Sequence, residues 1–196
     1  MKLERKPWIV LVTGLNGIRK TTSTQQPWFA EAVRLSLDNW SETTSMPSSS
    51  QPTVDDDLPS GTNSFFRQLD YIIATVANEE FKALYQTTTT SVEEYSLLKD
   101  AIFARYRTIA EVVGVLLIKA AMKKRMNVMV ETSGRDIAMF EYVDAFFPDS
   151  EYRKLVVHFC VNEIGFAARS VDLRMQREML LGSKAVNTEE ASSARY

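Results

Sequence analysis

The sequence predicts an α/β fold in which helices cover both faces of a mostly parallel sheet. Three short apolar runs carry this prediction: WIVLVT at 8–13, NVMVE at 127–131 and LVVHFCV at 155–161. Continuous apolar runs of this length are typical of strands that are buried on both faces. Longer stretches with helical periodicity lie between them, and this alternation predicts helical crossovers between parallel strands.

The helical stretches are expected to begin directly after the first strand. A helix is predicted from about Lys20 to Leu37, and Pro27 should kink it or end its first part. A later helix begins after Ser91, which can cap it together with Glu94 three residues on. Gly182 is expected to stop the last helix. The remaining predicted helices span 65–85, 91–125, 136–147 and 163–181. One apolar stripe is expected on the 91–125 helix, formed by Ile102, Tyr106, Ile109, Val113, Leu116 and Ala120.

Length and composition indicate one soluble domain over residues 1–196. Residues 41–64 are rich in Ser, Thr and Pro, which predicts a mobile insertion, and a flexible tail is expected from about 183 to 196. The formal net charge of −2 gives no support to binding of nucleic acid or of a membrane surface. The short apolar run near the N-terminus is too short for a secretory signal, and no run is long enough to span a membrane. We therefore expect a cytoplasmic location.

A candidate phosphate-binding loop follows the first strand, within TGLNGIRKTTS at 13–23. The P-loop motif reads Gly, four residues, Gly, Lys, then Ser or Thr. Gly14, Lys20 and Thr21 stand at the required spacing, Arg19 replaces the second motif glycine, and Gly17 adds a flexible position. The residues expected to contact the nucleotide are Gly14, Leu15, Asn16, Gly17, Ile18, Arg19, Lys20, Thr21 and Thr22.

The residue types in this loop suit the chemistry of polyphosphate binding. Glycines let several backbone N–H groups converge on one anion. The Lys20 ammonium can reach the terminal phosphates, and the Thr21 hydroxyl can bind Mg²⁺. Two readings of Arg19 stay open, since its side chain either obstructs the loop or points outward and adds a phosphate contact. The alternative interpretation of the whole segment is an ordinary strand-to-helix turn with a solvated lysine.

The loop, taken together with VMVETSGRD at 128–136, resembles the zeta-toxin family of P-loop kinases. GLNGIRKT at 14–21 matches the family loop GxPGxGKT at Gly14, Gly17, Lys20 and Thr21, and ARSVDLRMQRE at 168–178 is similar to its arginine-bearing lid. The resemblance implies a three-layer P-loop NTPase-like fold. It also implies transfer of the γ-phosphoryl group of ATP or GTP, with Mg²⁺, to a hydroxyl of a small molecule, in known members a UDP-activated amino sugar.

The resemblance further implies candidate catalytic residues. Asp57 is expected to orient or deprotonate the acceptor hydroxyl, with Asp55 and Asp56 as open alternatives, although a run of like charge can also be a solvated patch. Glu131, at a strand end, is expected to accept a substrate hydrogen bond or to hold a metal-bound water, although a carboxylate there can also cap the helix that begins near Asp136. The lid candidates are Arg169, Arg174 and Arg177, although for any single one of them a solvated helix residue is the favoured reading.

His158 and Cys160 are interpreted as structural residues. The chain has one histidine, so no second imidazole can complete a metal site, and a satisfied core or strand-end histidine is favoured. Cys160 is expected to be a small buried residue.

Two other functional readings stay open beside the kinase. The Arg19 departure favours a degenerate nucleotide-binding domain without turnover. Three strands are also fewer than a doubly wound sheet usually has, which suggests a truncated or divergent chain. The second of these readings is a protein-interaction domain in which the loop binds nothing.

Overall fold

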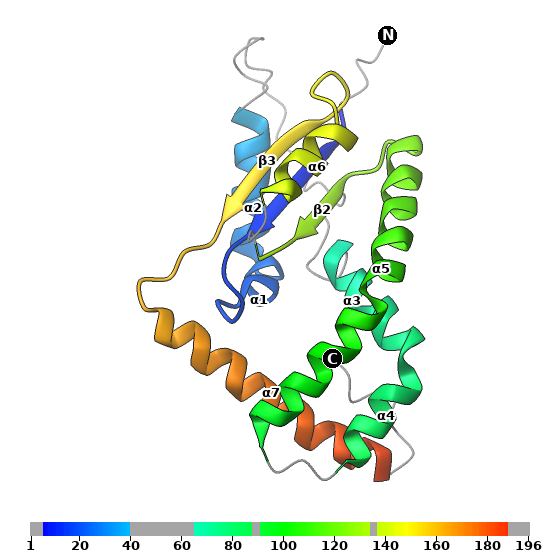
Figure 1. The fold of residues 1–196 in the computed structure, drawn as a ribbon. Coiled ribbons are helices and arrows are strands. Elements are labelled where there is room, and N and C mark those ends of the chain that lie inside the picture. Colours follow the sequence, from blue (N-terminus) through cyan, green and yellow to red (C-terminus); the bar gives the residue numbers. More distant parts are fainter. Residues whose placement is uncertain (1–5, 40–64, 88–90, 134–136, 188–196) are drawn as a thin grey trace. The chain divides into compact units, whose positions relative to one another are not determined.

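A parallel sheet of three strands organises the described part of the chain, which in this computed structural model comprises residues 6–39, 65–87, 91–133 and 137–187. The strands are β1 (Trp8–Thr13), β2 (Val128–Glu131) and β3 (Arg153–His158), in the order β2-β1-β3 (Figure 1). Both neighbours run parallel to β1, which confirms the α/β class and the parallel sheet. β3 begins and ends earlier than its apolar run because pairing with β1 sets its span, from Arg153 opposite Trp8 to His158 opposite Thr13.

The central strand β1 is buried along its whole length because helices pack on both of its faces. Side chains alternate between the two faces of a strand. One face carries Trp8, Val10 and Val12, which pack in one apolar cluster with Phe29, Val33 and Leu37 of α2 (Pro27–Asn39). The helix α2 therefore covers this face.

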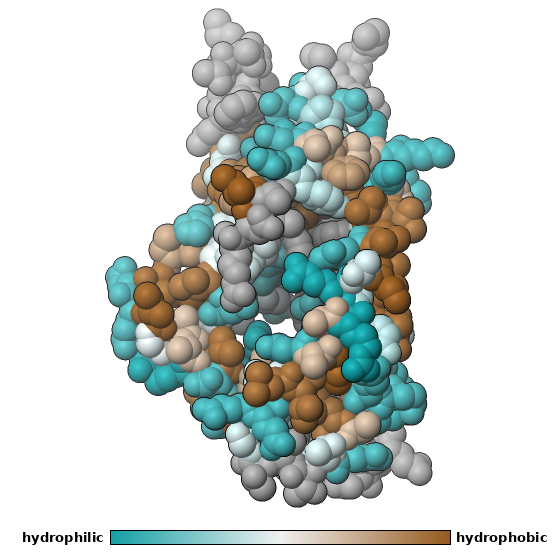
Figure 2. Space-filling model, in the orientation of Figure 1, coloured by the Kyte–Doolittle hydropathy of each residue, from teal (hydrophilic) through white to brown (hydrophobic). Residues whose placement is uncertain are grey.

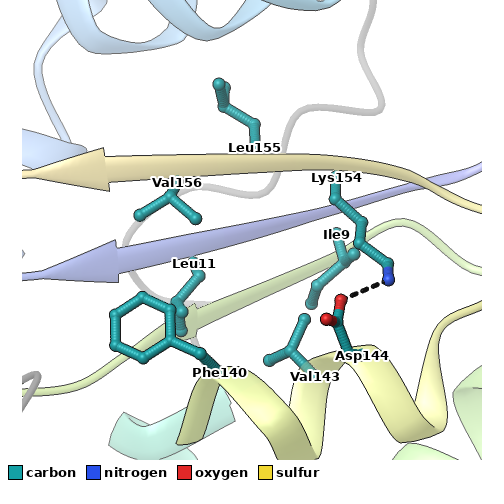
Figure 3. Close-up of a pocket in the computed structure, with 8 residues that line it drawn as sticks. All are labelled: Ile9, Leu11, Phe140, Val143, Asp144, Lys154, Leu155 and Val156. Atoms are coloured by element: carbon teal, nitrogen blue, oxygen red, sulfur yellow. Dashed lines mark hydrogen bonds and ion pairs between the residues drawn. The ribbon is translucent and has the colours of Figure 1, made fainter. Parts of the chain in front are cut away.

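The opposite face of the sheet packs against α6 (Ala138–Phe146). A hollow of about 230 Å³ lies between this helix and the sheet, lined mainly by apolar side chains (Figure 3). At its rim Lys154 forms an ion pair with Asp144, with Nζ and Oδ1 2.5 Å apart. The lining residues are Ile9, Leu11, Phe140, Val143, Asp144, Lys154, Leu155 and Val156.

The predicted break at Pro27 is confirmed. A first short helix, α1 (Lys20–Thr24), ends before Pro27, and α2 begins at that residue. Proline lacks the N–H that a continuing helix needs, but it is well suited to a first helical position. The segment that leaves β1 is therefore followed by a helix of only five residues.

The described residues form two compact units by contact. The first holds the sheet with α1, α2 and α6, and the second is helical. The second unit is built mainly from α3 (Phe65–Val76), α4 (Asn78–Gln86), residues 92–115 of α5 (Val92–Lys123), and α7 (Ile164–Asn187). The expectation of a single domain stays a prediction, and the predicted insertion at 41–64 lies outside the described residues.

The second unit has its own core, in which aromatic residues of α4 and α5 meet α7. Tyr95 is fully buried, and its ring stacks on that of Tyr85 with centroids 6.4 Å apart. Glu178 of α7 accepts hydrogen bonds from the Tyr95 hydroxyl at 3.0 Å and from Lys99 Nζ at 2.6 Å. Burial, reinforced by the negative charge of Glu178, raises the pKa of the Tyr95 phenol. These contacts tie α5 to α7.

The helix α5 confirms the predicted long helix, and Glu94 N donates to the Ser91 hydroxyl at 3.3 Å as the capping prediction requires. The predicted apolar stripe is only partly buried. Ile102 belongs to the core of the second unit, whereas Ile109 and Leu116 are 52% and 60% exposed. The second half of the helix buries Ala110 and Ile118 instead, at 2% and 1% exposure, and Figure 2 shows apolar side chains exposed along it.

Two predicted helix boundaries are wrong. The predicted helix 65–85 is divided at Ala77 into α3 and α4, and α7 does not stop at Gly182 but continues to Asn187. A Cβ at position 182 would overlap the ring of Tyr85, so glycine stands there because the helix passes close to an aromatic side chain. No helix in the described ranges has the length and hydropathy that a bilayer crossing demands.

Gly182→Ala should destabilise the protein although alanine is the better helix former. We expect a loss of about 1–3 kcal/mol, because the added methyl group displaces the Tyr85 ring from a packed core. Gly165→Ala, in the same helix, is the matched control: its Cβ would meet neighbours only at ordinary distances of 3.4 and 3.5 Å. That control should be neutral or stabilising by up to about 1 kcal/mol. Urea unfolding of both variants measures the difference, and equal stability would contradict the packing at Tyr85.

Candidate functional site

The segment between β1 and α1 curls tightly, as the phosphate-loop motif predicts. Gly14 and Gly17 have φ values of 140° and 86°, and Arg19 has a φ of 63°. Positive φ is easy for glycine and costly for residues with a Cβ. A second constraint acts at position 17, since a Cβ there would overlap the carbonyl oxygen of Ala167, which belongs with residues 16–18 to the second unit.

Lys20 is held against the loop itself. Its side chain is buried, and Nζ donates to the carbonyl oxygens of Gly14 at 2.7 Å and Leu15 at 2.9 Å. These bonds close the loop around an ammonium group. The positive charge is thereby kept at the carboxyl end of β1, the edge of the sheet where open α/β folds bind ligands.

Several backbone N–H groups of the loop make no hydrogen bond to the described residues. None of the N–H groups of residues 15–18 donates to another residue in the described part of the chain. Leu15 and Asn16 are exposed, while Ile18 is buried. Consecutive N–H groups without a protein acceptor are what an anion-binding concavity offers to phosphate oxygens.

Thr21 and Glu131 meet across the sheet edge. The Thr21 hydroxyl lies 2.7 Å from Oε1 and 3.0 Å from Oε2 of Glu131. Glu131 ends β2 and stands opposite Val12 of β1, so the parallel register brings its carboxylate beside the first turn of α1. Both side chains are half-buried. This contact joins two residues that the sequence singles out and that lie 110 positions apart.

The Thr21–Glu131 pair fits the ligands that Mg²⁺ prefers. Mg²⁺ in nucleotide sites uses one or two protein oxygens and takes its other ligands from water and phosphate. A hydroxyl and a carboxylate within hydrogen-bond distance match that donor set. The described residues contain no group of three or more His, Cys, Asp and Glu side chains suited to a metal, so they offer no all-protein cage.

Arg19 stands at the position where the P-loop motif has its second glycine. Its φ of 63° and ψ of 32° place it in the left-handed region, at the N-cap position of α1. Its side chain is exposed, which favours the outward reading over the obstructed one. Because α1 has only five residues, the loop amides and Lys20 are the main groups available to hold an anion.

The remaining predicted site residues are not brought to the loop by any described contact. Arg169, Arg174 and Arg177 are exposed residues of α7 and belong to the second unit. Arg169 forms an ion pair with Glu163, with Nη2 and Oε1 3.1 Å apart. Thr22 is exposed in α1. Asp55, Asp56 and Asp57 lie outside the described residues, so the role of Asp57 and of the lid arginines stays a prediction.

A contact between Thr13 and His158 lies at the same edge of the sheet. His158 ends β3 and is exposed, and its Nδ1 lies 2.7 Å from the hydroxyl of Thr13. This confirms a satisfied strand-end histidine. The sequence gives no signal for this contact, because it follows from the register in which His158 stands opposite Thr13. Cys160 is exposed, not buried, because β3 ends two residues before it.

Comparison of the chain with protein-family models, with curated proteins and with solved structures finds no match.

Arg19→Gly should stabilise the protein by about 1 kcal/mol, because glycine relieves the strain of the left-handed conformation. The greater entropy of glycine in the unfolded chain offsets part of this gain. Arg125→Gly is the matched control, because Arg125 also has positive φ, at 51°, but lies just after α5 and outside the loop sequence. Thermal unfolding of both variants measures the effect. A clear loss of stability in Arg19→Gly alone would mean that the Arg19 side chain makes contacts that outweigh its strain.

Proposed function

We propose that the chain binds the phosphates of ATP or GTP with Mg²⁺ in the loop 14–22, within a three-layer P-loop NTPase-like fold. We further propose that it transfers the γ-phosphoryl group to a hydroxyl of a small molecule, as the resemblance to the zeta-toxin family implies. One observation carries the proposal: the Lys20 ammonium and the Thr21–Glu131 pair gather at the carboxyl ends of β1 and β2.

The electrostatics of the loop support a polyphosphate ligand. A buried ammonium favours negative charge, and so does a row of N–H groups that donate to no described residue. Bonds between such donors and phosphate oxygens are charge-assisted and are stronger than bonds between neutral groups. The carboxylate of Glu131 would repel a bare phosphate, so its presence at the same edge supports a ligand that arrives with a divalent cation.

Thr21 and Glu131 are the residues that would hold Mg²⁺. When bound, the cation neutralises charge on the phosphate oxygens. Both carboxylate oxygens of Glu131 accept from the Thr21 hydroxyl. This arrangement supports a metal-associated role for Glu131, either direct or through a metal-bound water, over a role as the base that deprotonates the acceptor.

Phosphoryl transfer makes one bond and breaks one. The acceptor oxygen bonds to the γ-phosphorus, the bond from that phosphorus to the β–γ bridging oxygen breaks, and the nucleoside diphosphate leaves. The hydroxyl proton passes to a carboxylate, for which we propose Asp57. Arg169, Arg174 and Arg177 are proposed to stabilise the charge of the transferring group.

The second candidate function is nucleotide binding without turnover, and Arg19 favours it. A residue with a Cβ in the left-handed region departs from the motif at the position directly before Lys20. Loss of phosphate alignment by even a small displacement lowers the transfer rate far more than it lowers binding.

Lys20→Ala should weaken the binding of a fluorescent ATP analogue by about 10- to 100-fold, because it removes a donor to a charged group. Lys82→Ala is the matched control, since Lys82 pairs with Glu79 on the surface of α4. Fluorescence titration measures both affinities, and circular dichroism checks that the variants are folded. Equal affinity of Lys20→Ala and the wild type would remove the loop from the site.

Glu131→Gln should reduce the gain in nucleotide affinity that Mg²⁺ provides, by about tenfold, while affinity without Mg²⁺ stays the same or rises. Glutamine keeps an oxygen for the Thr21 hydroxyl but loses the negative charge. Titrations with and without Mg²⁺ separate the two effects, with Glu79→Gln on α4 as the control. An undiminished Mg²⁺ effect in Glu131→Gln would exclude this carboxylate from the metal site.

Transfer itself is tested by incubating the protein with Mg²⁺, γ-labelled ATP or GTP and a panel of nucleotide sugars. Label that appears on an acceptor with the wild type but not with Lys20→Ala supports the kinase. Tight nucleotide binding with no labelled acceptor in the panel supports the second candidate function.

A further inference from the structure

We infer that His158 donates a hydrogen bond from Nε2 to a phosphate oxygen of the bound nucleotide, and that Thr13 fixes the imidazole in the tautomer this requires. The inference rests on the proposed function, because it adds a donor to the same phosphate site.

The position of His158 follows from strand pairing. His158 stands opposite Thr13 in the parallel register, and Phe159 N donates to the Thr13 carbonyl oxygen at 2.9 Å, which keeps the two strand ends together. Neighbouring strands lie about 4.8 Å apart. Thr13 is followed directly by Gly14, whose carbonyl oxygen accepts from Lys20 Nζ at 2.7 Å. The imidazole therefore lies at the sheet edge that holds the phosphate loop.

The protonation of the ring follows from the burial of Thr13. Its side chain is 1% exposed, so the hydroxyl proton needs an acceptor inside the protein. Within the described ranges the hydroxyl has one partner, His158 Nδ1 at 2.7 Å. If the hydroxyl donates, Nδ1 must be the unprotonated nitrogen, and in a neutral imidazole the proton then sits on Nε2. The opposite tautomer would leave a buried hydroxyl proton without an acceptor.

The remaining nitrogen is then available to a ligand. Nε2 lies on the other side of the ring from Nδ1 and so faces away from the buried hydroxyl, and His158 as a whole is exposed. The Thr13 bond restricts rotation of the ring, so the Nε2–H donor is oriented before any ligand arrives. A pre-oriented donor at the sheet edge where the loop begins, and where Gly14 holds the Lys20 ammonium, suits a phosphate oxygen.

The chain has one histidine, so a single imidazole reports on the inference. Nitrogen NMR of protein labelled in the histidine ring should show the proton on Nε2 in mildly alkaline buffer. The Nε2 resonance should shift when Mg²⁺ and a non-hydrolysable ATP analogue are added. The same addition to Lys20→Ala should leave the resonance unchanged.

Two substitutions separate the two ring nitrogens. Asparagine places an acceptor near the position of Nδ1 but has no donor near Nε2, and glutamine does the reverse. His158→Asn should therefore keep the melting temperature and bind the analogue about tenfold more weakly. His158→Gln should bind it more tightly than His158→Asn and should melt lower, since it leaves the Thr13 hydroxyl without its partner.

The outcomes distinguish this inference from the proposed function. A proton on Nδ1 would overturn the tautomer assignment. Nucleotide binding by the wild type with an unmoved Nε2 resonance and undiminished affinity in His158→Asn would overturn the inference alone. Absence of nucleotide binding by the wild type would overturn both.

Discussion

The parallel pairing of β1 with β2 on one side and β3 on the other decides which side chains can meet in this protein. Parallel strands end at the same edge, and here that edge gathers Thr13, Glu131 and His158. The loop that leaves β1 begins at the same place, so Lys20 and Thr21 join them. A shift of one residue in the register of β2 would turn the Glu131 carboxylate to the other face of the sheet and separate it from Thr21.

The candidate site brings an ammonium group and a carboxylate to the same edge of the sheet. An ammonium held against carbonyl oxygens and a carboxylate held by a hydroxyl both satisfy their hydrogen bonds in the protein alone. Neither arrangement needs a nucleotide for its stability. The N–H groups of residues 15–18, which donate to no described residue, are the part of the loop that a ligand would satisfy.

Arg19 shows how a motif can tolerate a substitution at a cost in strain. The backbone of Arg19 is in the left-handed region, which glycine adopts easily. Arginine adopts it with steric strain, because its Cβ approaches the backbone. The surrounding contacts hold Arg19 in this conformation, because β1 fixes one end of the loop and the Lys20 hydrogen bonds close the other. The exposed side chain leaves the interior of the loop to backbone groups.

The amino-acid sequence by itself determined the fold class, the three strands and the loop, because each depends on local signals: continuous apolar runs, glycines and a proline. It also marked Lys20, Thr21 and Glu131. It did not determine that α7 passes through Gly182, since only the Tyr85 ring makes glycine necessary there. Nor did it determine the contact of Thr13 with His158 or the exposure of Cys160. Those were decided by the tertiary structure, because strand register and helix packing join residues that no local pattern connects.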